Sequence, residues 1–291
     1  MVEFDVPEPD YDRYTNRQLL AVPLITLTIA LLIIGGFWVV TGSPAHLGID
    51  FAGGTELTVD TADDEDEIRE AFDTEIDSIQ DVQQPSDRYI ITFSEGDDLS
   101  SVANESLTPV DDDSEVVVGE QTISPLFAAE MQMQALLALA IAFVGMSILA
   151  FVFFRTFVPS VAIVASAFSD MVIPLAMMNL LGIELTLGTV AALLMLIGYS
   201  VDSDILLNNH ILRRRGDFYE STYSAMQTGV TMTVTSMVAM ATMAIVATFF
   251  GIGLLQSVGL ILFIGLAADL MNTYLMNLSM LRWYKFEGVK R

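Results

Sequence analysis

The sequence predicts a polytopic α-helical membrane protein with six transmembrane helices and one small α+β domain between the first and second helices. Of its 291 residues, 53% are hydrophobic, which is more than ordinary soluble domains contain. Six apolar stretches are each long enough to cross a bilayer, which requires about 20 residues in a helix. Most of the acidic residues are confined to one segment between the first two stretches. These observations together predict a membrane bundle with one hydrophilic domain.

The apolar stretches also divide the chain into regions. The six predicted spans are Leu19–Val40, Ala135–Phe154, Phe157–Leu181, Leu185–Leu207, Ala225–Phe250 and Leu254–Leu281. We therefore expect an amino-terminal tail (residues 1–18), a first helix (19–40), an α+β domain (41–134), five further helices (135–281) and a carboxyl-terminal tail (282–291). The first span is too long for a cleavable signal peptide, and no small-residue cleavage pattern follows it.

The basic residues predict the orientation of the spans. If the spans alternate, one side of the membrane carries Arg13, Arg17, Arg155, Arg213, Arg214, Arg215, Arg282, Lys285, Lys290 and Arg291. Because positive loops face the cytoplasm, this side is expected to be cytoplasmic. The sequence thus predicts a multi-pass protein of the cytoplasmic membrane, with both termini inside and the acidic domain outside.

The acidic domain has an extreme charge. Between Ala45 and Glu130 there are 24 acidic residues and two arginines, a formal charge of −22. This charge excludes nucleic acid as a partner, because phosphate binding requires the opposite sign. A solvated surface suited to high salt is the main interpretation, since a charge far from zero mainly serves solubility. The chain has no cysteine, the acidic runs lack the spacing of a calcium loop, and we expect no metal and no cofactor.

Secondary structure within this domain follows from residue patterns. Strands are predicted at Glu56–Val59, Tyr89–Phe93 and Glu115–Val118, where apolar residues alternate or cluster. A short helix is predicted at Glu67–Phe72, with Asp63 or Asp64 as its cap. The intervening residues 95–110 are predicted to form a polar loop. A core of this size is marginal alone, so a partner subunit is expected to support it.

Four ionisable residues lie inside the predicted spans, and these are candidate sites for ion coupling: Asp170, Asp202, Asp204 and Asp269. Carboxylates within a membrane are costly and therefore mark functional sites by default. Asp202 and Asp204 are about 200° apart around a helix, so they cannot share one face. We predict that Asp202 faces the interior of the bundle.

Span five carries a face of small and hydroxyl side chains. Thr228, Thr231, Thr235, Ala239 and Thr242 follow helical spacing. Such residues allow close helix packing, which is the main interpretation for most of them. Thr231 and Thr235 are the predicted hydrogen-bond donors to Asp202.

Three segments resemble the SecD/SecF family of protein-export membrane proteins. Residues 48–55, GIDFAGGT, are similar to the GIDFTGGT segment of that family and contain Gly48, Asp50, Phe51, Gly53, Gly54 and Thr55. Residues 169–173, SDMVI, resemble the family's HDVLI, and residues 187–202 resemble NLATVAALLTIIGYSIND. The six-helix order with one domain is similar to the SecF branch over essentially the whole chain, and the acidity resembles haloarchaeal proteins.

The resemblance implies an RND-like membrane fold and an accessory role in the Sec translocase. It implies SecD, a SecYE-type channel and the unfolded exported polypeptide as partners in the lipid membrane, and no enzymatic activity. Bacterial relatives use intramembrane carboxylates to couple ion flow to export, but their acid corresponds to Ser203 here and their fifth-helix arginine to Thr231. The structural segment Gly53–Gly54 is interpreted as a hinge, with Asp50 able to cap or orient it. Two alternatives are a stand-alone RND-type exporter of lipids or small molecules and an uncoupled scaffold of the channel.

Overall fold

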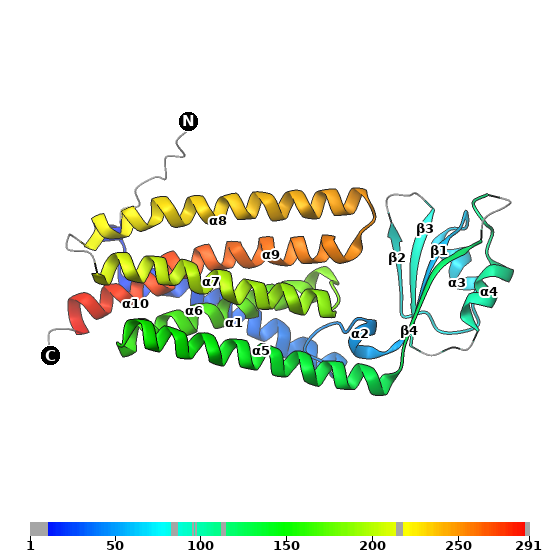
Figure 1. The fold of residues 1–291 in the computed structure, drawn as a ribbon, viewed down its shortest axis with the longest axis horizontal. Helices are drawn as coiled ribbons and strands as arrows, with labels where there is room; N and C mark the ends of the chain where they lie inside the picture. Colours follow the sequence, from blue (N-terminus) through cyan, green and yellow to red (C-terminus); the bar gives the residue numbers. More distant parts are fainter. Residues whose placement is uncertain are drawn as a thin grey trace.

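The computed structural model of the chain describes residues 11–82, 87–94, 96, 98–111, 115–213 and 218–288. A long helical bundle carries an α+β domain at one end (Figure 1). The beginning of helix α1 and the short helix α10 lie at the opposite end of the bundle. Several basic residues named above fall outside the described part of the chain, namely Arg214, Arg215, Lys290 and Arg291.

Six helical segments in the described residues are long and apolar enough to cross a membrane, which confirms the predicted fold class. The first five are α1 (Asn16–Thr41), α5 (Pro125–Phe154), α6 (Phe157–Leu181), α7 (Leu187–Arg213) and α8 (Phe218–Phe249). The sixth consists of α9 (Gly253–Met271), a π-helical turn η2 (Asn272–Asn277), α10 (Leu278–Trp283) and a second π-helical turn η3 (Tyr284–Gly288). A π-helical turn within a helix is rare and often marks a functional site.

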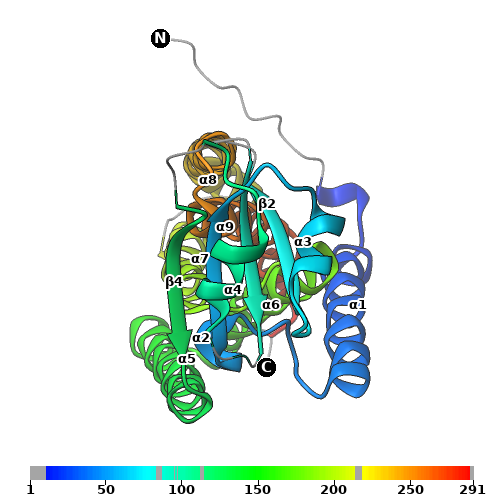
Figure 2. The same ribbon diagram turned by 90° about the vertical axis from the view of Figure 1, so that its right-hand side faces the viewer.

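The helices form a centre and a periphery. Helices α6 and α7 have 61% and 56% of their most apolar stretch buried, whereas α1, α5 and α8 have only 17%, 11% and 11% buried. Seen along the bundle, α6, α7 and α9 lie between α1 on one side, α5 on another and α8 on a third (Figure 2). Polar residues placed on α6, α7 and α9 are therefore those that can be enclosed by protein.

The α+β domain contains a four-stranded antiparallel sheet. Its strands are β1 (Gly54–Asp60), β2 (Ser78–Val82), β3 (Arg88–Phe93) and β4 (Val117–Ile123), in the order β2-β3-β1-β4. The strands predicted at Glu56–Val59 and Tyr89–Phe93 are confirmed, whereas the one predicted at Glu115–Val118 begins at Val117 and extends further. The prediction of a polar loop over residues 95–110 was wrong, because this stretch contains helix α4 (Leu99–Ser106). The helix buries Leu99 and Ala103.

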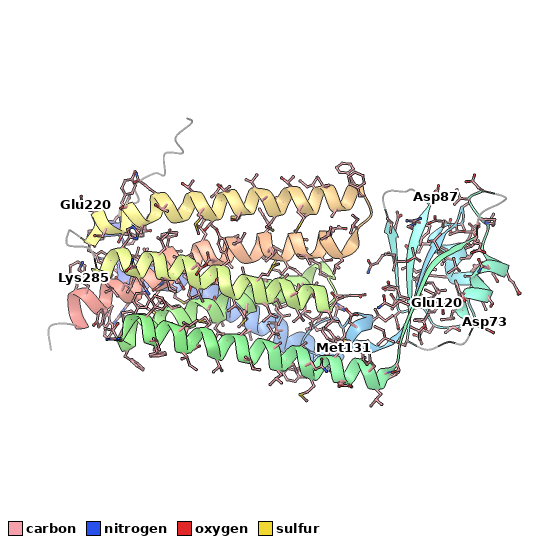
Figure 3. All side chains as sticks on the ribbon, in the orientation of Figure 1. Asp73, Asp87, Glu120, Met131, Glu220 and Lys285 are labelled. Atoms are coloured by element: carbon pink, nitrogen blue, oxygen red, sulfur yellow. The ribbon has the colours of Figure 1, made fainter. Side chains whose placement is uncertain are left out.

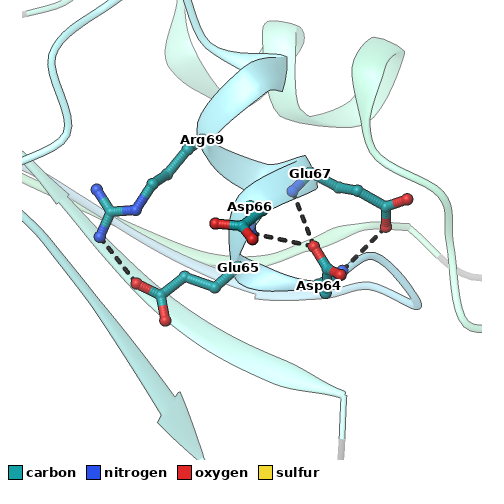
Figure 4. A network of polar contacts seen from close by, with 5 residues as sticks. All are labelled: Asp64, Glu65, Asp66, Glu67 and Arg69. Carbon is teal, nitrogen blue, oxygen red and sulfur yellow. Dashed lines mark hydrogen bonds and ion pairs between the residues drawn. The ribbon is translucent and has the colours of Figure 1, made fainter.

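One apolar core holds this domain together. Leu57 and Ile91 of the sheet pack with Ile68 of α3 (Glu65–Ala71) and with Ala103 of α4. Helix α3 begins where the sequence predicts a cap, because the Asp64 carboxylate accepts hydrogen bonds from the N–H groups of Asp66 and Glu67 (Figure 4). The Glu67 side chain in turn accepts a 3.1 Å bond from the Asp64 N–H, so the helix start is a complete capping box.

At the other end of the bundle, the amino-terminal turn η1 (Tyr11–Arg13) packs across the helices. The Tyr11 ring is buried in an apolar cluster with Tyr274, Leu278 and Leu281. The Arg282 guanidinium donates to the carbonyl oxygens of Tyr11 and Tyr14 at 2.9 and 3.0 Å. Burial raises the pKa of the Tyr11 hydroxyl to about 12, so this side chain remains an uncharged member of the cluster.

Candidate functional site: a buried carboxylate network

Three carboxylates meet in the centre of the bundle. Asp170 of α6, Asp204 of α7 and Asp269 of α9 are only 1%, 0% and 0% exposed. Neither of the two ion pairs formed by the described residues involves any of them. Since an isolated buried charge is very costly, these groups must be supported by hydrogen bonds or by a bound cation or proton.

Asp170 has hydrogen-bond donors on both of its oxygens. The Ser200 hydroxyl of α7 donates to Oδ2 at 2.5 Å, and the Asn272 amide of η2 donates to Oδ1 at 2.6 Å. This carboxylate therefore joins all three central helical segments. Each of its two oxygens is thus bonded within the protein, which fits a structural centre of the network.

Asp204 and Asp269 are linked through one hydroxyl group. The Thr273 Oγ1 atom lies 3.0 Å from Asp204 Oδ1 and 3.3 Å from Asp269 Oδ1. Asn277 donates to Asp204 Oδ1 at 2.7 Å, and Ser203 donates to Asp269 Oδ1 at 2.8 Å. The second oxygen of each carboxylate, Oδ2, has no hydrogen-bond partner among the described residues.

Apolar layers close the network on both sides. Toward the α+β domain lies a cluster that includes Met178, Leu193, Leu196 and Leu266. Toward the opposite end lies the cluster that contains Tyr11, Leu207 and Tyr274. The carboxylates are thus enclosed between two hydrophobic seals, an arrangement in which any bound ion is held away from water.

The prediction that Asp202 faces the bundle interior was wrong. Asp202 is exposed on α7, whereas Asp204 is fully buried. The buried face of α7 is the one that contains Ser200, Asp204 and Asn208, all on one helical stripe. Asp202 lies on a different stripe of α7 together with Gly198 and Asn209, and all three residues are exposed.

The predicted hydroxyl face of span five does not contact the carboxylates either. Thr228, Thr231, Thr235 and Thr242 are all exposed on α8. The hydroxyls of Thr231 and Thr235 donate to Gln227 and Thr231 carbonyl oxygens of their own helix. This local bonding satisfies each hydroxyl without a neighbouring helix, so the interpretation of these threonines as donors to Asp202 was wrong.

Five polar partners of the network were missed by sequence reasoning: Ser200, Ser203, Asn272, Thr273 and Asn277. A repeated pattern could have indicated them. Residues 166–170 and 200–204 both read Ser-x-x-Ser-Asp, and Asp269, Asn272 and Thr273 repeat the same three-and-four spacing. Such spacing places polar groups on one helix face, and three such faces in one bundle indicate a common polar centre.

The segment GIDFAGGT lies at the other site of interest, the junction between bundle and domain. Residues 49–52 form a short helix α2 (Ile49–Ala52), and the Phe51 carbonyl accepts a 2.5 Å bond from Gln132 of α5. Gly48 donates to the Leu185 carbonyl at 2.9 Å. The segment is therefore fixed by hydrogen bonds to α5 and to the α6–α7 loop, and its role as a hinge stays a prediction.

The fold and the site define a multi-pass membrane protein with a buried carboxylate network and a single α+β domain. The sequence profile described as "Protein export membrane protein SecD/SecF, C-terminal" matches residues 102–287, and the profile "SecD/SecF GG Motif" matches residues 38–64. The chain belongs to the SecD/SecF family of protein-export membrane proteins.

Individual relatives agree with this assignment. The chain is 59% identical to the "Protein-export membrane protein SecF" of Haloferax volcanii, over 100% of both chains. It is 40% identical to the protein of the same description from Methanolacinia petrolearia, over 97% of this chain and 98% of that one. The crystal structure of SecDF from Thermus thermophilus shares the fold, with a TM-score of 0.74 at 20% identity, and the match covers 96% of this chain but 39% of that one.

Proposed function

We propose that this chain is a SecF-type accessory subunit of Sec protein export and that its buried carboxylates couple export to an ion gradient. Family membership and full-length similarity to proteins described as SecF support the role in export. The observation that carries the coupling is the network of Asp170, Asp204 and Asp269, which is buried in the membrane bundle without a basic partner among the described residues. Membrane carboxylates enclosed in this way are typical of ion and proton pathways.

SecD is the proposed partner within the membrane. The family profile and the SecDF relatives support this pairing. Exposed polar side chains support it further: Asp202 and Asn209 on α7, and Gln227, Thr231 and Thr235 on α8. A carboxylate facing hydrocarbon is costly, so a partner helix bundle that covers Asp202 is favoured over lipid.

The complete assembly would place a Sec channel and the unfolded exported polypeptide beside this pair. The proposed orientation has the termini in the cytoplasm and the α+β domain outside, as the basic residues predict. The stand-alone exporter is disfavoured because one six-helix set is half of a transporter whose sites form between repeats. The scaffold alternative predicts that the buried carboxylates can be neutralised without loss of export.

Replacement of a buried carboxylate tests the coupling. Asp204→Asn keeps the shape of the side chain and removes its charge, so SecD association is expected to persist while secretion slows at least tenfold. Asp202→Asn is expected to weaken co-purification with SecD, since Asp202 lies on the exposed face. The measurements are pulse-chase secretion of a reporter and co-purification of SecD from the same cells. Normal secretion by both Asp204→Asn and Asp269→Asn would rule out ion coupling at these residues and favour the uncoupled scaffold.

A further inference from the structure

Helix α5 carries an open groove on its outer surface. The groove has a volume of about 550 Å³ and is lined by six residues of this one helix: Phe143, Val144, Ser147, Ile148, Phe151 and Val152. These residues form two neighbouring rows with a spacing of four, and the groove runs between the rows along the helix. Ser147 is small, and its hydroxyl donates at 2.8 Å to the Phe143 carbonyl of its own helix. The groove therefore presents an apolar lining to its occupant.

One wall of this groove is held in place by α6. The Phe143 ring packs against Phe168 with ring centroids 6.3 Å apart, and the Phe151 ring packs against Phe157 with ring centroids 6.1 Å apart. Ser147 lies one turn from both Phe143 and Phe151, so the space between these two rings stays open. A binding surface that is already fixed in shape loses little freedom when a ligand binds. The groove is thus preformed for an extended apolar group.

The length and depth of the groove match one hydrocarbon chain of a lipid. Val152 lies nine residues after Phe143, which corresponds to about 14 Å along the helix. The hydrocarbon core of a bilayer is about 30 Å thick, so one leaflet contributes about 15 Å. The groove occupies the second half of α5, which is the half away from the α+β domain (Figure 1). It therefore lies beside the hydrocarbon chains of the leaflet on that side.

A cation without an acidic partner among the described residues stands at the end of the groove. Arg155 follows α5 directly, one turn beyond Phe151, and is exposed. It takes part in neither of the two ion pairs that the described residues form. Its φ is +51°, and glycine is the usual residue in this left-handed conformation at the end of a helix. Arginine is less stable there than glycine, which indicates that its side chain has a role.

We propose that α5 binds one membrane lipid with an anionic phosphate headgroup, whose hydrocarbon chain lies in the groove and whose phosphate pairs with Arg155. A guanidinium group suits phosphate because its fork of N–H donors matches the phosphate oxygens. Basic side chains at the membrane surface are typical binding sites for anionic headgroups. The start of α6, two residues after Arg155, has no side-chain cap and adds a positive end near the same point.

A helix of a partner protein is disfavoured as the occupant. The exposed polar side chains that a partner bundle is expected to cover include Gln227, Thr231 and Thr235 of α8. Helix α8 lies on a different side of the bundle from α5 (Figure 2). The groove itself offers an apolar lining and one cation at its end, which is the pattern of a lipid with its chain and headgroup.

The test is native mass spectrometry of the full chain in detergent. The chain is titrated with phosphatidylglycerol and, in parallel, with phosphatidylcholine that has the same hydrocarbon chains but no net charge. One phosphatidylglycerol molecule is expected to bind about fivefold more tightly than phosphatidylcholine, which is the usual contribution of one basic residue near an anionic headgroup. Equal affinity for the two lipids would reduce the groove to ordinary contact with bulk lipid and overturn the proposal.

Matched variants assign the binding to this site. Arg155→Gly removes the charge and suits the left-handed backbone, so the chain should stay folded while the preference for phosphatidylglycerol is lost. Arg155→Lys should retain most of the preference. Arg17→Gln removes another exposed basic residue at the same end of the bundle and should keep the preference. Ser147→Phe fills the groove and should weaken lipid binding, whereas Ala138→Phe, at an exposed position of α5 outside the groove, should not.

Three results would overturn the proposal. The first is an unchanged preference in Arg155→Gly, and the second is unchanged lipid affinity in Ser147→Phe. The third is an equal loss of preference in Arg17→Gln and Arg155→Gly, which would show general attraction to a basic surface. Co-purification of SecD is measured with the same variants and should not change. Its loss in Ser147→Phe, but not in Ala138→Phe, would assign the groove to a helix of SecD in place of lipid.

Discussion

Asp50 of the short helix α2 accepts a 2.9 Å hydrogen bond from the backbone N–H of Leu187, the first residue of α7. The first N–H groups of a helix have no partner within the helix. Two further N–H groups are satisfied by threonine side chains: the Thr186 N–H donates to the Thr189 hydroxyl at 2.7 Å, and the Thr189 N–H donates to the Thr186 hydroxyl at 3.3 Å. A residue from the joint before the α+β domain thus completes the start of the helix that carries Asp204, and it links the domain to the carboxylate network through one rigid element.

Removal of this cap should loosen the joint. Asp50→Ala is expected to cost about 0.5–2 kcal/mol of stability, as losses of helix caps do. Asp50→Asn retains an acceptor oxygen and should cost much less. Hydrogen exchange at the Leu187 amide is the direct measurement, and it should accelerate in Asp50→Ala. Unchanged exchange there would show that the bond does not hold the start of α7.

Gly54 occupies a backbone conformation that side chains rarely adopt. Its φ is +115°, and a Cβ atom there would lie 2.2 Å from the Phe93 carbonyl oxygen. Gly54→Ala is expected to destabilise the α+β domain by about 1–3 kcal/mol, from strain alone. Gly119→Ala, where the nearest atom lies 3.6 Å from a Cβ, is the matched control in the neighbouring strand. Equal thermal unfolding of the two variants would contradict this account.

The junction between domain and bundle should respond to pH. Burial raises the pKa of Glu56, with a further contribution from Asp50, and burial also raises the pKa of Glu184, beside Glu56 and Asp77. The folded-state pKa of each carboxyl lies above its unfolded value of 4.5. The contribution of each group to folding stability is therefore complete below pH 4.5 and is lost as the pH rises through the folded-state pKa. Tm should therefore fall as pH rises from 4.5. Glu184→Gln should flatten this slope, whereas exposed Glu120→Gln should not.

The α+β domain should need high salt. Its acidic residues, including Asp73, Asp87 and Glu120, lie over its surface (Figure 3). Its two arginines, Arg69 and Arg88, pair with Glu65 and Asp60. Repulsion is screened over about 3 Å at 1 M salt but extends about 30 Å at 0.01 M. Tm of the full chain should fall as KCl is removed, and less so after Asp73→Asn and Glu120→Gln together. A salt-independent Tm would refute the prediction.

The proposed orientation is tested by labelling in intact cells. A cysteine introduced at Asp73, on the α+β domain, should react with a membrane-impermeant maleimide, whereas a cysteine at Glu220 should react only after lysis. Glu220 and Lys285 lie at the bundle end away from the domain (Figure 3). The chain has no native cysteine, so each label reports a single position. Labelling of the Glu220 position in intact cells would indicate the opposite orientation.

Apolar patterning was sufficient to predict the membrane fold. A long uninterrupted apolar stretch must be helical in a bilayer. For this reason the ends of five of the six predicted spans lie within about two helical turns of the observed ends. The exception is α5, which begins earlier than predicted, at Pro125. In the domain, local chemistry predicted two strands and a cap at Asp63 or Asp64, and the structure has the cap at Asp64. Helix α4 was missed because its residues are largely polar and only Leu99 and Ala103 are buried by tertiary contacts.

Apolar length and helical period are enough to predict that four carboxylates lie within membrane-spanning helices and that Asp202 and Asp204 point to different faces. Which of these faces is enclosed depends on how the helices pack together. Polar side chains occur on both faces of α7, so its own pattern does not distinguish them. The choice depends on packing against α6 and η2, where Ser200 meets Asp170 and Thr273 meets Asp204. The spacing of polar residues on α7 alone does not encode these contacts, and only its repetition on the neighbouring segments hints at them.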